Sequence, residues 1–229
     1  MRMRFHQGLD ELKEKLLAMG GLAEQAIDRA TEAYRKRDLK LCYAVLEGER
    51  AINMAEREID ELALDLLAMQ QPLAVDLRFI TAIMKINADL ERVGDQAVNI
   101  AERVMDTIKL PAVDLPVDIP RMAATAAGMV RRALESFIEG KAELAEAILK
   151  MDDIVDQMND EIYIVLVKKM HENPASVDQA LDVLLIARNL ERVADHATNI
   201  AEDVIFWVRG ADVRHHAGMQ ETQAPPAVS

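Results

Sequence analysis

Apolar residues recur every three or four positions along most of the chain, in segments that are free of proline. This spacing puts apolar side chains on one face of an α-helix. In one segment, for example, it runs through Leu90, Val93, Ala97, Ile100 and Val104. The pattern predicts helices near residues 5–36, 39–70, 75–108, 119–139, 141–170 and 177–208.

Prolines mark where the helical pattern stops, because a helix interior tolerates them poorly. Pro111, Pro116 and Pro120 cluster between the third and fourth predicted helices, so we interpret residues 109–120 as the linker. The other connections are short, which makes helices that follow one another antiparallel. We expect one domain over residues 1–110, a second over 117–209, and a loose tail over 210–229.

The two halves of the chain repeat each other. Residues 90–104 read LERVGDQAVNIAERV and residues 190–204 read LERVADHATNIAEDV, with eleven of fifteen positions identical. A repeat of this kind indicates duplication of one structural unit. The predicted fold is therefore all-α, with six long helices arranged as two tandem three-helix bundles.

Composition narrows the range of functions. A hydrophobic share of 51% with 29% charged residues is typical of a folded chain, and a net charge of −13 disfavours nucleic acids and anionic membranes as partners. No apolar run is long enough to insert into a membrane. No nucleotide-binding glycine pattern and no nucleophile with a placed base occurs, so we do not expect an enzyme.

Within the repeat, the shared polar residues form an acidic stripe. At about 100° per residue, Glu91 and Asp95 fall on the side opposite the apolar positions, and Glu191 and Asp195 repeat this arrangement. We therefore expect both stripes on the solvent face. His196, which follows Asp195, is expected at the surface as well.

Carboxylates at positions i and i+4 repel each other, and a hard cation such as Mg²⁺, Ca²⁺, Mn²⁺ or iron removes that repulsion. A neighbouring helix must supply further ligands. Asp152 and Asp156 have the required spacing in the second half, whereas Glu49 is followed by the neutral Asn53 in the first. A solvated acidic face that binds no ion is the alternative, and the residues alone leave both open.

In this doubled motif and in several others, the chain resembles the PhoU family. The resemblance extends from about residue 5 to about 215 and rests on four motifs: Leu-Glu-Arg-Val-x-Asp at 90–95 and again at 190–195, Gln71-Pro72 leading to Asp76-Leu77-Arg78, Ala18-Met19-Gly20-Gly21, and Gly48-Glu49-x-x-x-Asn53.

The resemblance implies two three-helix bundles joined end to end, in a cytoplasmic homodimer. It implies a negative regulator of the phosphate-starvation response that links the phosphate-specific ABC transporter ATPase to a sensor histidine kinase. It also implies sites for Mg, Mn, Fe or Zn at Glu49, Glu91, Asp95, Asp152, Asp156, Glu191 and Asp195, with weaker binding in the first bundle because of Asn53. The alternative is a structural helical protein without a phosphate role.

Overall fold

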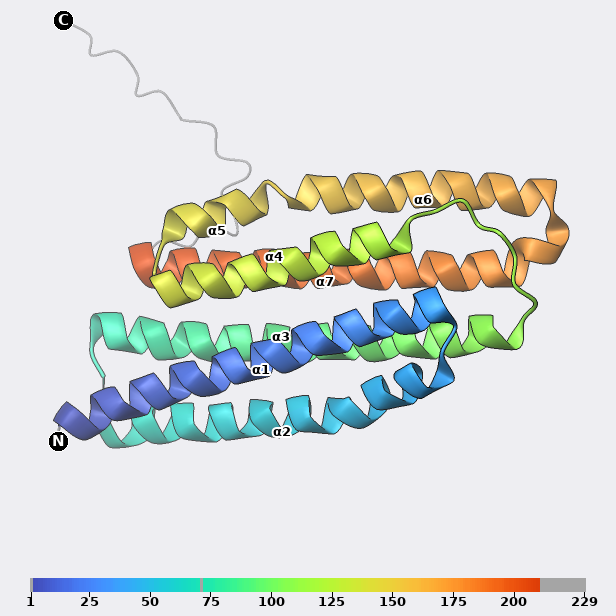
Figure 1. Ribbon diagram of the computed structural model, residues 1–229. Helices are drawn as coiled ribbons and strands as arrows, with labels where there is room; N and C mark the ends of the chain where they lie inside the picture. Colours follow the sequence, from blue (N-terminus) through green and yellow to red (C-terminus); the bar gives the residue numbers. More distant parts are fainter. Residues whose placement is uncertain (1, 71, 211–229) are drawn as a thin grey trace, which may run out of the picture.

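The computed structural model describes residues 2–70 and 72–210, and within these ranges the chain is helical and contains no β-strand (Figure 1). The all-α prediction is therefore confirmed. The elements are α1 (Arg2–Lys36), α2 (Leu39–Gln70), α3 (Ala74–Lys109), α4 (Ile119–Glu139), α5 (Ala142–Leu149), α6 (Asp152–Glu172), the 3₁₀ turn η1 (Pro174–Ser176) and α7 (Val177–Arg209).

Local sequence explains where the helices of the second half begin and end. The Asp118 side chain accepts a hydrogen bond from the backbone N–H of Arg121 at 3.0 Å and caps the first turn of α4. Helix α4 ends at Gly140 and α7 at Gly210, which have φ angles of 61° and 71°. Glycine adopts this left-handed conformation without a steric cost, so both helices stop there.

The fifth predicted helix, residues 141–170, is interrupted in the structure. Helix α5 ends at Leu149, Lys150 and Met151 form a turn, and α6 begins at Asp152. The Met151 N–H donates to the Ile148 carbonyl at 2.8 Å across this turn. Two consecutive aspartates favour a helix start, because their charge interacts well with the positive end of the helix dipole. The prediction of a single helix was wrong here. Because of the interruption, Asp152 lies in the first turn of α6.

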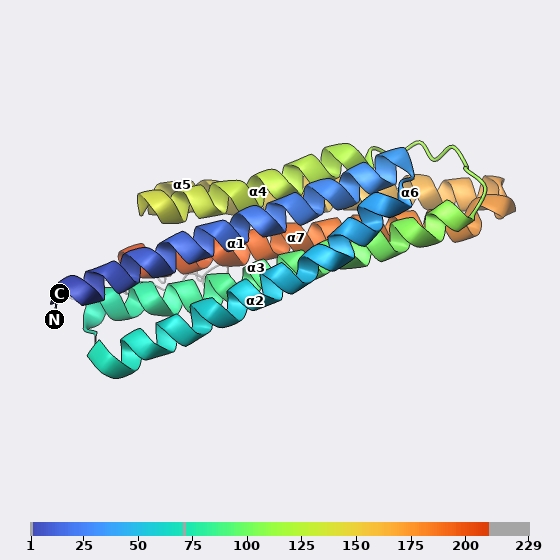
Figure 2. The same cartoon turned by 60° about the horizontal axis from the view of Figure 1, so that its bottom comes forward.

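The two bundles, α1–α3 and α4–α7, lie side by side and not end to end (Figures 1 and 2). Helix α3 packs antiparallel along α7, and α1 packs against α4. The end-to-end expectation was wrong because α3 and α7 are each buried on two sides. Both helices bury polar residues in addition to their apolar stripe, among them Asp89 and Gln96 in α3 and His196 and Asp203 in α7.

We call the contact between α3 and α7 the seam. Two ion pairs cross it: Lys85 Nζ lies 3.1 Å from Asp203 Oδ1, and Arg103 Nη1 lies 3.6 Å from Asp182 Oδ1. The buried apolar residues of both bundles form one continuous core through this contact. The two repeats are therefore one packed unit.

An aromatic cluster closes one end of the molecule and joins the bundles. Phe79 of α3 has its ring centroid 5.6 Å from that of Phe137 in α4 and 5.1 Å from that of Trp207 in α7. Aromatic pairs at these separations add to the energy of simple apolar burial. This cluster contains the chain's single tryptophan.

The linker between the bundles is held at two points. Arg37, in the α1–α2 turn, donates to the carbonyls of Thr107 at 2.8 Å and Leu110 at 2.7 Å. The Val113 N–H donates to Gln179 Oε1 of α7 at 2.9 Å.

The ranges 1–110 and 117–209 remain predictions as domain boundaries. The tail predicted over 210–229 lies, beyond Gly210, outside the described residues. No helix in the described ranges is long and apolar enough to cross a membrane.

Candidate functional site

Four predicted carboxylates meet where α6 runs along α7. Asp152 and Asp156 lie in the first turns of α6, and Glu191 and Asp195 lie midway along α7. Burial, then repulsion from Asp156 and Asp195, raises the pKa of Asp152 to about 6, and burial followed by Asp195 raises the pKa of Asp156. Groups that shift one another in this way are close neighbours. These four predicted residues therefore lie close together, and we call them the second acidic cluster.

Within the second acidic cluster, the carboxylates differ in how well they are partnered. Glu191 accepts hydrogen bonds from Arg188 at 2.7 Å and from Asn159 at 2.8 Å. Burial raises the pKa of Glu191, and Arg188 counteracts this effect. Asp152 Oδ1, by contrast, is buried and has no hydrogen-bond partner. Since an unpartnered buried oxygen is costly, this atom is the place in the cluster where an added donor or cation would stabilise the structure most.

A corresponding cluster forms between α2 and α3 in the first bundle. Burial, then repulsion from Asp95 and Glu56 and more weakly from Glu49, raises the pKa of Glu91. Burial, Asp60 and then Asp95 raise the pKa of Glu56. We call Glu49, Glu56, Glu91 and Asp95 the first acidic cluster. The predicted Glu49, Glu91 and Asp95 thus act on one another, and sequence reasoning missed Glu56.

Glu56 changes the difference in metal binding that we expected between the two clusters. It lies seven residues after Glu49, or two helical turns, and so on the same helix face, which was the signal that could have identified it. The repeat also aligns Glu58-Ile59 of α2 with Glu161-Ile162 of α6, an offset of 103. In this alignment Glu56 corresponds to Asn159, and Asn53 corresponds to Asp156. The amide and the carboxylate have therefore exchanged places between the bundles. The first cluster is not poorer in charge, so Asn53 alone gives no reason for weaker binding there.

Of the four stripe carboxylates that we expected on an open solvent face, Glu91, Asp95 and Glu191 are only partly exposed, whereas Asp195 is exposed as expected. Glu91 and Glu191 are only partly exposed, because α2 and α6 lie beside the stripes. The helical wheel considered only one packing partner for each helix and so overestimated the exposure of these residues. The half-buried position explains why burial comes first among the causes that raise the pKa of both glutamates.

Both acidic clusters have the ligand chemistry of a hard-cation site, although their side chains are not arranged as one. No group of three or more His, Cys, Asp or Glu side chains in the described ranges is positioned to hold a metal ion. The buried free oxygen of Asp152 and the mutual repulsion of its neighbours nevertheless fit a divalent cation. Such a cation would be held by the carboxylates of Asp152, Asp156, Glu191 and Asp195. Its positive charge would offset their mutual repulsion.

His196 is buried in the seam, so the prediction that it lies at the surface was wrong. Its Nδ1 lies 2.9 Å from Asp89 Oδ1, and Asn199 Nδ2 donates to the same oxygen at 3.2 Å. Asp89 of α3 is thus satisfied by two residues of α7. A wheel drawn for one bundle places His196 at the edge of the core, and only the neighbouring bundle covers it.

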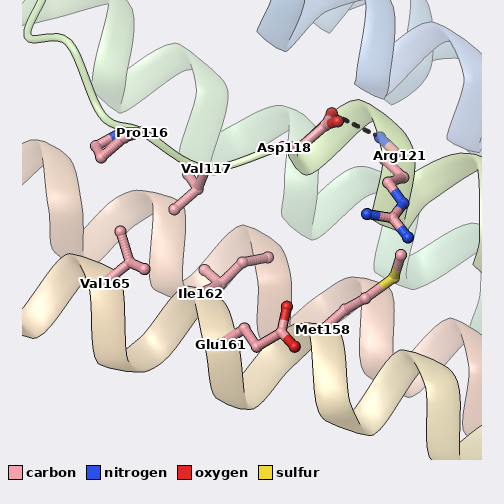
Figure 3. Close-up of a pocket in the computed structure, with 8 residues that line it drawn as sticks. All are labelled: Pro116, Val117, Asp118, Arg121, Met158, Glu161, Ile162 and Val165. Atoms are coloured by element: carbon pink, nitrogen blue, oxygen red, sulfur yellow. Dashed lines mark hydrogen bonds between the residues drawn. The ribbon is translucent and has the colours of Figure 1, made fainter.

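Figure 3 shows a small hollow between the end of the linker and α6. Pro116 and Val117 lie on one side, with Ile162 and Val165 on the other, and the volume is about 140 Å³. The nearby Glu161 carboxylate accepts a hydrogen bond from Gln157 at 3.1 Å. The hollow contains none of the predicted site residues, so the acidic clusters remain the candidate site.

Comparison with protein families gives the chain an identity. The family model described as the PhoU domain matches twice, over residues 16–104 and 119–204. The chain belongs to the PhoU family. The two matched PhoU domains fall on the two bundles, and each contains one acidic cluster.

Curated PhoU relatives resemble the chain over nearly its full length. The "Phosphate-specific transport system accessory protein PhoU homolog" of Pseudomonas putida is 40% identical over 93% of this chain and 83% of the relative. The PhoU accessory protein of Escherichia coli K12 is 32% identical over 94% of this chain and 89% of the relative.

Solved PhoU structures have the same fold. PhoU from Pseudomonas aeruginosa superposes with a TM-score of 0.86 at 37% identity, covering 90% of this chain and all of that one. The phosphate transport system regulatory protein PhoU from Streptococcus pneumoniae gives 0.82 at 28% identity, covering 91% of this chain and 99% of that one.

Proposed function

We propose that this chain is an accessory protein of phosphate-specific transport that lowers the phosphate-starvation response and has no catalytic turnover of its own. The observation that carries the proposal is the 40% identity to the P. putida accessory protein across 93% of the chain. In this proposal the protein acts in the cytoplasm as an adaptor. Its partners are the ATPase of the phosphate ABC transporter and a sensor histidine kinase, and it acts as a homodimer.

Gene deletion tests the regulatory role. In phosphate-rich medium, cells that lack the gene should express a phosphate-starvation reporter, such as alkaline phosphatase, and a plasmid copy should restore repression. Unchanged reporter activity in the deletion strain would refute the regulatory role. Co-purification of the tagged protein with the transporter ATPase and with the kinase tests the adaptor role separately.

The main alternative is a structural helical protein whose acidic clusters serve only solubility. Glu191→Ala together with Asp195→Ala distinguishes the two. Both residues are at least partly exposed, so the altered protein should keep a melting temperature close to that of the wild type. The structural alternative then predicts normal repression, whereas the adaptor proposal predicts a higher reporter level in phosphate-rich medium.

We further propose that a divalent or iron-type cation binds the acidic clusters, supported by the repulsion among their carboxylates and the unpartnered Asp152 oxygen. An ion that binds only the folded state raises its stability by mass action. Adding Mg²⁺, Mn²⁺, Fe²⁺ or Zn²⁺ to chelator-treated protein should therefore raise the melting temperature.

Matched substitutions test which carboxylates hold the ion. Asp156→Asn should reduce the metal-induced rise in melting temperature at the second cluster, and Glu56→Gln should do so at the first. Asn53→Ala removes no charge and should have little effect. Titration calorimetry that detects no binding at millimolar ion would refute the metal proposal, and the regulatory proposal would be unaffected.

A further inference from the structure

A second surface, beside the second acidic cluster, is formed between the outer parts of α6 and α7. It is a hollow of about 600 Å³ whose walls carry Tyr163 from α6 and Leu181, Leu184 and Leu185 from α7. Tyr163, Leu181 and Leu185 are each about half exposed. Single exposed leucines are normal on a protein surface, but apolar side chains that gather around one hollow indicate a binding surface. We call this hollow the α6–α7 groove.

The internal repeat shows that the fold does not require this apolar surface. In α3, Thr81 and Lys85 occupy the positions of Leu181 and Leu185, at the offset of 100 residues that relates the two repeats. Helix α2 aligns with α6 at an offset of 103, which matches Glu58-Ile59 to Glu161-Ile162, and there Asp60 occupies the position of Tyr163. The apolar stripe of the core, by contrast, is kept in both helices, for example at Leu90 and Leu190 and at Val93 and Val193. Leu184 corresponds to the apolar Met84, but the apolar character of the exposed walls at Tyr163, Leu181 and Leu185 belongs to the second bundle alone and needs an explanation other than core packing.

Charge at the edge of the groove indicates what it binds. Asp160 lines the groove and Asp156 lies one turn before it, and neither has an ion pair within the described part of the chain. Arg188 also lines the groove, but its charge is compensated by Glu191 at 2.7 Å. In the first bundle the counterpart of Asp160 is Arg57, so the sign of this edge is reversed as well. The groove thus combines an apolar floor with an acidic edge.

We propose that the α6–α7 groove binds an amphipathic helix of another protein, with Leu or Phe side chains in the groove and Lys or Arg side chains against Asp156 and Asp160. Leu181 and Leu185 lie one turn apart, which matches side chains at i and i+4 of a bound helix. A second copy of this chain that paired through the same groove fits poorly, since it would bring the same acidic edge.

This inference deepens the adaptor role and rests on it only for the identity of the protein that carries the helix. The binding chemistry is measured on purified protein, whereas the adaptor role is measured in cells. Either can therefore fail without the other. Chelator is present throughout, so that metal binding to the neighbouring cluster does not contribute.

The probe is a fluorescein-labelled helical peptide of about 15 residues, roughly four turns, with Leu at i and i+4 and Lys or Arg beside them. A second peptide keeps the leucines and replaces every basic residue with Glu. Fluorescence anisotropy should show binding of the basic peptide that weakens with salt, because charge pairs at an exposed edge are screened. Binding of the acidic peptide should be at least about tenfold weaker. Equal binding of both peptides would overturn the proposed partner chemistry.

Two substitutions with the same change in charge locate the binding surface. Leu185→Lys introduces the residue that α3 has at the equivalent position and should weaken peptide binding at least about tenfold. Leu64→Lys, at another half-exposed leucine on α2, should leave it nearly unchanged. Similar losses in both would mean that the peptide responds only to net charge, and this would overturn the assignment to the groove.

A charge substitution and an association measurement complete the test. Asp160→Arg introduces the residue that the first bundle has at the equivalent position, Arg57. It should weaken binding of the basic peptide and strengthen binding of the acidic peptide. Thermal unfolding verifies that each variant folds, which is expected because the residues concerned are exposed. Sedimentation compares the association state of wild type with that of Leu185→Lys. If Leu185→Lys dissociated an oligomer of this chain, a second copy would be the occupant and the proposal would be wrong.

Discussion

Replacing Asp152 with asparagine should stabilise the folded protein at neutral pH, and this gain should shrink in mild acid. The pKa of Asp152 in the folded protein is about 6, against an ordinary value of 3.8. Above pH 6 the folded state therefore holds a charge that burial and the neighbouring carboxylates disfavour, while the unfolded chain is ionised without this cost. As the pH falls from about 6 toward 3.8, the folded protein takes up a proton and the cost shrinks. It is gone once the unfolded chain is protonated as well.

The size of the effect follows from the shift in pKa. A shift of about 2 units corresponds to about 3 kcal/mol when it is fully expressed. Water screens the partly exposed carboxyl group, so we expect about 1 kcal/mol for Asp152→Asn at pH 7.5. At pH 4.5 the wild-type group is largely protonated in the folded state, and the difference between the two proteins should fall by more than half.

Urea unfolding followed by circular dichroism at both pH values gives the two free-energy differences. Asp153→Asn is the matched control, because Asp153 lies in the same first turn of α6 and its side chain is exposed. It reports the general effect of removing a negative charge from a helix start, which is unfavourable by a few tenths of a kcal/mol or more. If Asp152→Asn were destabilising at pH 7.5, or if its effect were independent of pH, the proposed repulsion within the second acidic cluster would be wrong.

Two further predictions concern the contacts between the bundles. Phe79→Ala should lower the free energy of unfolding by about 2–3 kcal/mol and shift Trp207 emission to longer wavelength, because that indole loses an aromatic neighbour; unchanged emission would contradict the aromatic cluster. Gly21→Ala should stabilise α1 by about 0.5–1 kcal/mol, since a methyl group there meets nothing within 4 Å. At Gly20 the same methyl group would overlap the Leu134 side chain of α4, so Gly20→Ala should fall short of the Gly21→Ala gain in melting temperature. Equal gains would show that α1 and α4 are not in close contact.

The helical periodicity was sufficient to predict nearly every helix, because it reports local burial and the prolines report the breaks. It failed at Lys150–Met151, where neither proline nor glycine marks the interruption. The only local signal there was the pair Asp152–Asp153, which also fits the inside of an acidic stripe. Sequence reasoning assigned the pair to the stripe and so missed the start of α6.

For the site, the repeat identified both acidic stripes but could not predict that α2 and α6 partly cover them. A helical wheel assigns one buried side to each helix, whereas α3 and α7 each have two. The partners of His196 and Asp89 lie about 100 residues away in the chain, and no local pattern encodes that contact. Glu56 was accessible to sequence reasoning, since it shares a face with Glu49, but it lay outside the motifs that the repeat highlighted.

The seam also decides which helix can pair with which. Lys85 faces Asp203, and Arg103 faces Asp182. If α3 of a second copy took the place of α7, the residue equivalent to Asp203 would be Arg103, and two cations would face each other. If α7 took the place of α3, Asp203 would stand where Arg103 stands, opposite Asp182. Pairing α3 with α3, or α7 with α7, thus brings like charges together, whereas pairing α3 with α7 joins opposite charges. The charges of the seam therefore select the α3–α7 pairing over both like pairings.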